Sequence, residues 1–289
     1  MMSLRVFCWA LTVSGAIFTS ASTASVASAS EPCHQVVGGW NIIETANFRF
    51  CSRGKLSLTA KTLQAAEELR ERLTVKWSGK PAAGNDWQPK CDIVLHGTAA
   101  AYLRAVPGGG QTLGSSVIDV TGDTITTRRI DIRADQAGWF DGVLAHELTH
   151  LVLADLFPGS RLPAWADEGM AVMADPSGKQ DAHLRDLWLA QSQRGSFRLI
   201  ELLAMDDYPS PDRHAAFYGQ SVSLVQYLVE RGTPEQFVQF VRRGVERGYE
   251  QALRDIYHLN GVAELERHWR QYANTVGALA VRERRFNID

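Results

Sequence analysis

The residues with the clearest chemical potential form the pentapeptide His146-Glu147-Leu148-Thr149-His150. Two histidines four positions apart lie on one face of a helix, one turn above each other. Both imidazoles can therefore bind one metal ion, and zinc is the ion that this HExxH spacing indicates. Glu147 projects beside them, where it can accept a proton from a water at the metal. The pattern predicts a hydrolytic zinc site.

The residues around this motif are apolar, which indicates a buried helix. Leu144, Leu151 and Val152 flank the two histidines. Two histidines and a glutamate are costly to bury without partners, and a metal ion would remove that cost. The alternative is a metal-free buried helix in which the motif is coincidental and the histidines bond to backbone groups.

A zinc hydrolase needs a third protein ligand and leaves a fourth position open for water. The next predicted helix, from about Pro163 to Ala174, carries the adjacent carboxylates Asp167 and Glu168. They differ by about 100° around a helix, so both cannot face the metal equally. Either can be the ligand on these grounds. The other can accept the free N–H of a histidine ligand.

The sequence H-E-L-T-H followed by P-x-W-x-x-E-G-M-A resembles the gluzincins, zinc metallopeptidases of the peptidase MA-like kind. The resemblance implies that Glu168 is the third ligand of one Zn²⁺ per chain, with His146 and His150. It also implies hydrolysis of peptide bonds with Glu147 as general base. Some gluzincins place an aspartate four residues after the ligand glutamate, where this chain has Val172. The carboxylates that support the histidines must therefore differ, and Asp167 and Asp155 are candidates.

The resemblance also implies a hydrogen-bond donor for the oxyanion, taken from a tyrosine or histidine of a later helix. Tyr218, at the start of a helix predicted from Phe217 to Arg231, is the candidate. Packing against Phe217 is the alternative role. No G-x-M-E-N exopeptidase sequence occurs between Gly108 and Phe140, which favours an endopeptidase. The alternative function is a non-proteolytic, zinc-bound binding module of zincin fold.

The hydrophobic periodicity predicts an α+β fold. A strand-rich first half gives way to helices after Phe140. The resemblance implies a zincin-like arrangement, in which a strand-rich N-terminal lobe packs on a mainly helical C-terminal lobe with the HExxH helix between them. The predicted divisions are a signal peptide at 1–29, the N-terminal α+β lobe at 30–140 and the helical lobe at 141–289, which together form one catalytic unit. Strands are predicted at 47–52, 91–96, 116–120 and 127–133, and the first helix at about 58–73.

The strand predicted at 127–133 alternates isoleucines with charged residues. Ile130 and Ile132 face one way, and Arg129, Asp131 and Arg133 face the other. Charge at this density is typical of an edge strand. In gluzincins an edge strand pairs with an extended peptide substrate.

The N-terminus has the features of a signal peptide. Arg5 precedes an apolar run, Val6 to Phe18, and Ala27-Ser28-Ala29 forms an A-x-A cleavage sequence. The run is shorter than the roughly 20 residues of a membrane span. We therefore expect an exported protein, periplasmic or extracellular, without stable membrane insertion after cleavage.

Composition restricts the partners. The net charge is −2 and no basic block occurs, which excludes the electrostatic footprint of a nucleic-acid partner. The expected partner is a peptide or protein substrate, and the oligomeric state is open. After cleavage Cys33, Cys51 and Cys91 remain. One pair can form a disulfide in an oxidising compartment, and the pairing is open.

Overall fold

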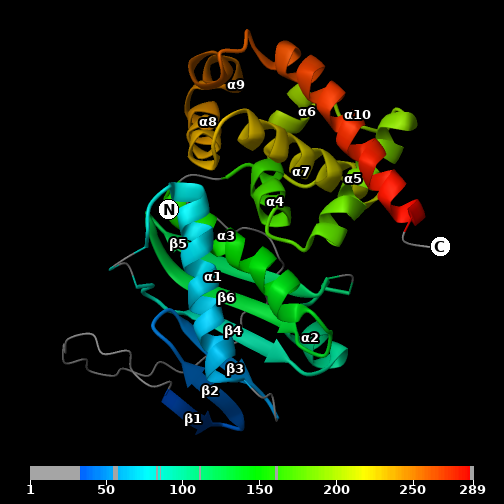
Figure 1. The fold of residues 1–289 in the computed structure, drawn as a ribbon. Coiled ribbons are helices and arrows are strands. Elements are labelled where there is room, and N and C mark those ends of the chain that lie inside the picture. The colour runs from blue at the N-terminus through cyan, green and yellow to red at the C-terminus, as the bar shows by residue number, and fades with distance from the viewer. Residues whose placement is uncertain are drawn as a thin grey trace. The chain divides into compact units, whose positions relative to one another are not determined.

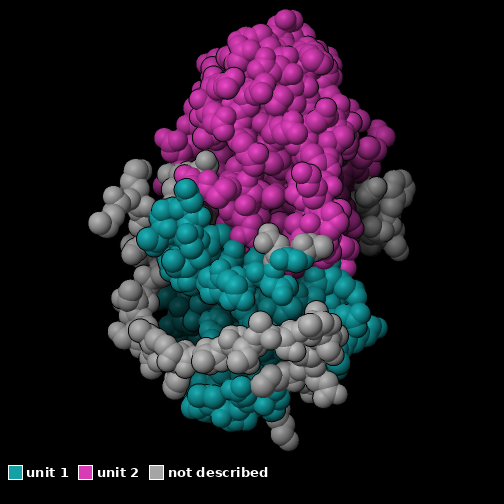
Figure 2. All heavy atoms as spheres, turned by 90° about the vertical axis from the view of Figure 1, so that its left-hand side faces the viewer, with its two compact units in different colours: residues 1–69, 83–139 teal, residues 70–82, 140–289 magenta. Residues whose placement is uncertain are grey.

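The computed structural model describes residues 33–54, 58–82, 84, 86–110, 112–159 and 162–286, so the predicted signal peptide lies outside it. The chain forms two compact units, coloured separately in Figure 2. Unit 1 comprises residues 1–69 and 83–139, and unit 2 comprises residues 70–82 and 140–289. The fold is a mixed α+β fold, as predicted.

Unit 1 is built on a six-stranded sheet with the order β1-β2-β3-β4-β6-β5 (Figure 1). The strands β1 to β3 are antiparallel, β3, β4 and β6 run parallel, and β5 pairs antiparallel with β6. The strand bounds are Cys33–Val37 (β1), Trp40–Glu44 (β2), Phe48–Ser52 (β3), Cys91–His96 (β4), Gly114–Thr121 (β5) and Thr124–Arg133 (β6).

One face of this sheet is apolar. Phe50, Ile93 and Ile130 share it in the strand register and are at most 1% exposed. The first half of α1 (Ala60–Ser78) belongs to the same unit. Its Glu67 carboxylate accepts hydrogen bonds from Thr45 and from the Asn47 backbone and side chain. These bonds fix the helix to the β2–β3 turn.

The other face of the sheet is charged, and it corrects the expectation of an edge strand at 127–133. The strand β6 lies between β4 and β5, and the two edge strands of the sheet are β1 and β5. Arg129 binds Asp131 through two hydrogen bonds of 2.7 and 2.8 Å, and His96 Nε2 lies 2.7 Å from the same carboxylate. Asp131 is only 3% exposed. Arg129 and Asp131 are therefore paired within the sheet, and Arg133 binds Asp135 just after the strand, so these charges do not protect an open edge.

The cysteines Cys51 and Cys91 are both free thiols. In the register of β3 and β4, Cys91 lies beside Phe48 and Cys51 lies beside Val94. Successive residues of a strand point to opposite faces, so the two thiols lie on opposite sides of the sheet. They cannot form a disulfide with each other in this fold. The side chain of Cys33 is outside the described residues.

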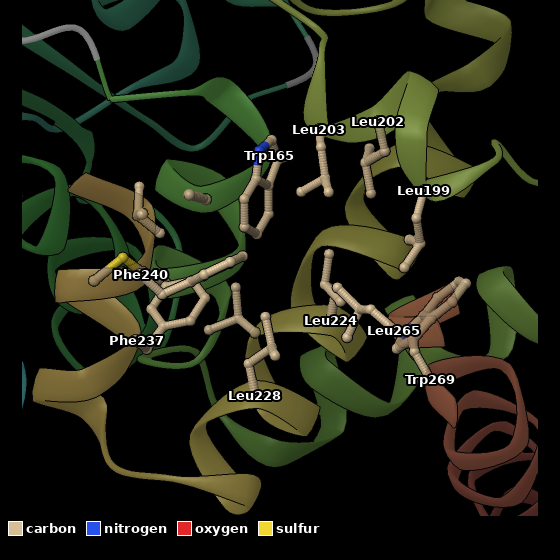
Figure 3. Packing of buried hydrophobic residues seen from close by; sticks show 14 of the residues in the cluster. Trp165, Leu199, Leu202, Leu203, Leu224, Leu228, Phe237, Phe240, Leu265 and Trp269 are labelled. Carbon is tan, nitrogen blue, oxygen red and sulfur yellow. The ribbon is translucent and has the colours of Figure 1, made fainter. Parts of the chain in front are cut away.

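Unit 2 is helical. Its core, shown in Figure 3, gathers aromatic and leucine side chains around α7. Trp165 meets Phe237 edge to face at 6.1 Å between ring centroids, and both are fully buried. Such side chains contribute roughly 1.5–3 kcal/mol each by burial. The helices are α3 (Ala145–Leu156), α4 (Ala164–Val172), α5 (Ser177–Ser192), α6 (Leu199–Leu203), α7 (His214–Arg231), α8 (Pro234–Arg247), α9 (Tyr249–Ala252) and α10 (Val262–Phe286).

Two helices begin with a threonine cap. The side chain of Thr98 accepts a hydrogen bond from Ala101 N and caps α2 (Ala99–Ala105) in unit 1. Thr233 caps α8 in the same way through Gln236 N. Within the described part of the chain, no helix combines the length and apolar character needed to cross a membrane.

Candidate metal centre

The HExxH motif lies on α3, as its spacing predicts. The ring centroids of His146 and His150 are 5.1 Å apart. The helix is buried by Leu148 and Leu151, which are 0% exposed. Glu147, between the two histidines in sequence, is also buried at 9% exposure. The local helix therefore presents two imidazoles and a carboxylate in a largely water-excluded place.

Glu168 is brought to the histidines by α4. The next residue, Gly169, lies against α7 so closely that a Cβ atom there would be 2.5 Å from Val225 Cγ2 and 2.6 Å from Ser221 O. Only glycine permits this approach without moving one of the helices. The Glu-Gly pair in the sequence thus fixes where the carboxylate of α4 lies.

The side chains of His146, His150 and Glu168 form a group that could hold a metal ion. One ligand atom from each lies within 4.8 Å of the others. His146 Nε2 is 3.6 Å from Glu168 Oε2. That oxygen is buried and has no hydrogen-bond partner among the described residues. A buried carboxylate oxygen is normally satisfied, so this one fits a metal ligand.

Two further carboxylates lie within hydrogen-bond distance of the Nδ1 atoms of the two histidines. Asp167 Oδ1 lies 2.7 Å from His150 Nδ1, and Asp175 Oδ2 lies 3.2 Å from His146 Nδ1. When Nδ1 donates to a carboxylate, the free lone pair of the neutral ring is on Nε2. Both rings can thus offer Nε2 to a metal ion. Of the two roles considered for Asp167 from the sequence, its position fits the acceptor of the histidine Nδ1 hydrogen.

Asp175 was not predicted. The other candidate, Asp155, is exposed near the end of α3. Asp175 is buried, and Lys179 Nζ lies 3.0 Å from its Oδ1. It comes seven residues after Glu168, beyond the end of α4 at Val172, and directly before Pro176. Helical spacing therefore did not mark it in the sequence.

Tyr208 is the second residue in contact with this group that sequence reasoning missed. Its hydroxyl is 2.5 Å from Glu168 Oε1, so Glu168 receives a hydrogen bond on one oxygen and leaves the other free. Burial raises the pKa of the Tyr208 hydroxyl, and the charges of Glu168 and Asp167 raise it further. The group therefore stays protonated and donates. Tyr208 lies in the loop after α6, where no periodic pattern marks it.

Tyr218, the predicted oxyanion donor, lies in the first turns of α7 within an aromatic group. Its ring stacks on His183 at 5.5 Å and meets His214 edge to face at 6.3 Å. His214 in turn meets Tyr208 at 6.4 Å. Tyr218 thus lies one ring away from the tyrosine that binds Glu168.

The electrostatics of the group favour charge on every member when no metal is bound. Burial lowers the pKa of His146, but the hydrogen bond to Asp175 and the nearby carboxylate of Glu168 outweigh it and raise the pKa to about 9. Burial likewise lowers the pKa of His150, and Asp167 outweighs it, giving about 10. Burial raises the pKa of Glu168, but the two histidines hold it at about 2.

These pKa values predict that protons compete with the metal. Below pH 9 the metal-free histidines are protonated, and a metal must displace both protons. We therefore expect the apparent zinc affinity to rise by about 10- to 100-fold per pH unit between pH 6 and 8. Competition with a chelator of known pH dependence measures it. An affinity independent of pH over this range would show that the histidines are neutral before binding.

A helix with two histidines and a buried glutamate, joined by a carboxylate from the next helix, defines a metallopeptidase-like protein. A model of the Peptidase MA superfamily matches residues 116–275. The chain belongs to this superfamily, whose members are typically metal-dependent. A search of curated proteins found no match.

Proposed function

We propose that the protein is a zinc-dependent endopeptidase, with His146, His150 and Glu168 as ligands of one zinc ion and Glu147 as general base. The observation that supports it most is the buried Glu168 Oε2, which lacks a hydrogen-bond partner beside the Nε2 atom of His146. Two imidazoles and one carboxylate are a donor set of catalytic zinc, which keeps a fourth position open. The superfamily membership supports the peptidase class.

Bound zinc supplies Lewis acidity, which polarises the scissile carbonyl and makes water a nucleophile near neutral pH. The protein's own groups then move the proton. Glu147 accepts it from the attacking water and delivers it to the leaving amine nitrogen. Asp167 and Asp175 hold the two imidazoles in the tautomer that offers Nε2.

The expected substrate is a peptide or protein chain in an extended conformation. The sequence has no exopeptidase motif of the G-x-M-E-N type before the HExxH helix, which favours cleavage within a chain. Export is part of the proposal, and it rests on the apolar run and the A-x-A sequence of the leader.

The oxyanion of the tetrahedral intermediate needs a donor besides the metal, and Tyr218 is the proposed one. A tyrosine hydroxyl has one hydrogen, and that of Tyr208 is already donated to Glu168. We expect Tyr218→Phe to lower kcat by about 100- to 1,000-fold with zinc content unchanged. Tyr208→Phe should act through Glu168 and weaken zinc binding instead. Steady-state kinetics and metal analysis separate the two, and an unchanged kcat in Tyr218→Phe would remove that residue from the chemistry.

Zinc content of the purified protein, wild type beside His150→Ala, tests the proposal. We expect one zinc per chain in the wild type and none in the variant, because loss of an imidazole leaves two protein ligands. Cleavage of an internally quenched peptide should follow the zinc. Wild type that binds no zinc after reconstitution would contradict the proposal. Bound zinc without hydrolysis of any peptide would favour the binding-module alternative.

A further inference from the structure

Unit 1 contains a cavity, separate from the metal-ligand group, in which three arginines converge. Its volume is about 470 Å³, and Arg53, Arg104 and Arg129 line it together with His96 and Trp40. Cavities of several hundred Å³ are the size that holds small molecules. Among the described residues that line this cavity, none is an aspartate or a glutamate. The cavity is therefore positively charged.

The cavity lies at the carboxyl ends of two parallel strands. Arg53 directly follows β3, His96 is the last residue of β4, and Arg104 lies on α2, the helix after β4 (Figure 1). Ligands of open α/β sheets bind beyond the carboxyl ends of parallel strands. Gly97 also lines the cavity, and a Cβ atom placed there would meet no atom within 4 Å. There is thus open space directly after β4.

The arginines differ in how their charge is balanced. Arg129 uses Nε and Nη2 to bind Asp131, which also lies against His96. A guanidinium has five N–H donors, so Arg129 has donors left. Arg53 lies over the Trp40 ring at 4.7 Å. Arg53 and Arg104 are both exposed, and within the described residues neither forms an ion pair. In the part of the chain that the structure describes, no carboxylate pairs with these two charges.

We propose that this cavity binds a small organic anion that carries two or more carboxylate or phosphate groups. Guanidinium groups bind both kinds of oxyanion through paired N–H donors. Arg53, which follows β3, and Arg104, on α2, can each bind one anionic group. Trp40 and the alanines of α2, Ala101 and Ala105, provide apolar surface for a carbon skeleton between them. The proposal does not depend on the proposed peptidase function.

Isothermal titration with two probes, tricarballylate and fructose 1,6-bisphosphate, tests the site at low ionic strength. We expect at least one probe to bind the wild-type protein, and the stronger one identifies carboxylate or phosphate as the recognised group. The double variant Arg53→Gln/Arg104→Gln should bind it at least about tenfold more weakly, since hydrogen bonds from charged groups are lost. Lys61→Gln, an exposed lysine on α1 in the same unit, is the matched control and should bind normally.

A second variant keeps both arginines. Ala105→Glu adds a carboxylate at a lining position, and glutamate is a good helix former, so α2 should remain intact. We expect the same loss of binding as in the double variant, with an unchanged melting temperature. The proposal is overturned if neither probe binds the wild type, or if a probe binds wild type and both variants equally. Equal binding to all three proteins would mean that the probe binds elsewhere, for example by chelating a metal ion in unit 2.

Discussion

Replacing Glu147 with glutamine is expected to leave one zinc per chain and to lower kcat for peptide cleavage by about 100- to 10,000-fold. Glutamine has nearly the same shape as glutamate, and Glu147 is not part of the group of ligand atoms formed by His146, His150 and Glu168. The metal site should therefore survive. The amide cannot accept the proton of the attacking water, so the hydrolytic step loses its base. Steady-state kinetics together with metal analysis of the same preparation measures both quantities.

The matched control for this experiment is Glu246→Gln, which makes the same chemical change on the exposed surface of α8 in the same unit. It should keep both zinc and activity. If Glu147→Gln instead retains full activity, the general-base role is wrong. If it loses zinc together with activity, Glu147 supports the metal site structurally. Kinetics of a sample reconstituted with zinc then shows whether Glu147 is also the general base.

The part of the candidate site that could be predicted is the part encoded by local spacing. The His146 and His150 pair depends only on the helical repeat, because residues four apart share a face in any helix. The strand β4 was predicted with its exact residues, since its apolar run has the length of a strand, is too short for a typical helix and contains β-branched residues. Tyr208 lies forty positions from Glu168, in a loop without periodicity. Only the folded structure, which brings this loop to α4, shows that contact.

The error over β6 has a physical cause that applies to other sheets. Alternation shows which side chains share a face, but it does not show which strands lie on either side. Arg129 and Asp131 are two residues apart and bond to each other, and His96 completes the group from β4. Buried charges that satisfy each other across neighbouring strands give the same sequence pattern as charges on an exposed edge.

Glu168→Ala is the second variant with a large expected effect, and we expect it to lose both zinc and hydrolysis. The substitution removes one of the three proposed protein ligands and leaves only the two histidines, of which His150 is buried and His146 partly buried. Zinc affinity should fall by more than about 100-fold, because even the carboxylates that support ligand histidines contribute 10- to 100-fold. Metal analysis and chelator competition measure the loss, and circular dichroism confirms that the helices remain.

Asp167→Asn gives the comparison that assigns the two adjacent carboxylates. Asp167 lies 2.7 Å from His150 Nδ1, on the side of the ring away from the proposed metal position, so the variant should keep zinc at about 10- to 100-fold weaker affinity. Asparagine can still accept the Nδ1 hydrogen, which limits the effect. The variant with the larger loss of zinc affinity therefore identifies which of the two carboxylates is the third ligand. A protein that keeps zinc in Glu168→Ala and loses it in Asp167→Asn would make Asp167 the third ligand, and the free Oε2 of Glu168 would then need another explanation.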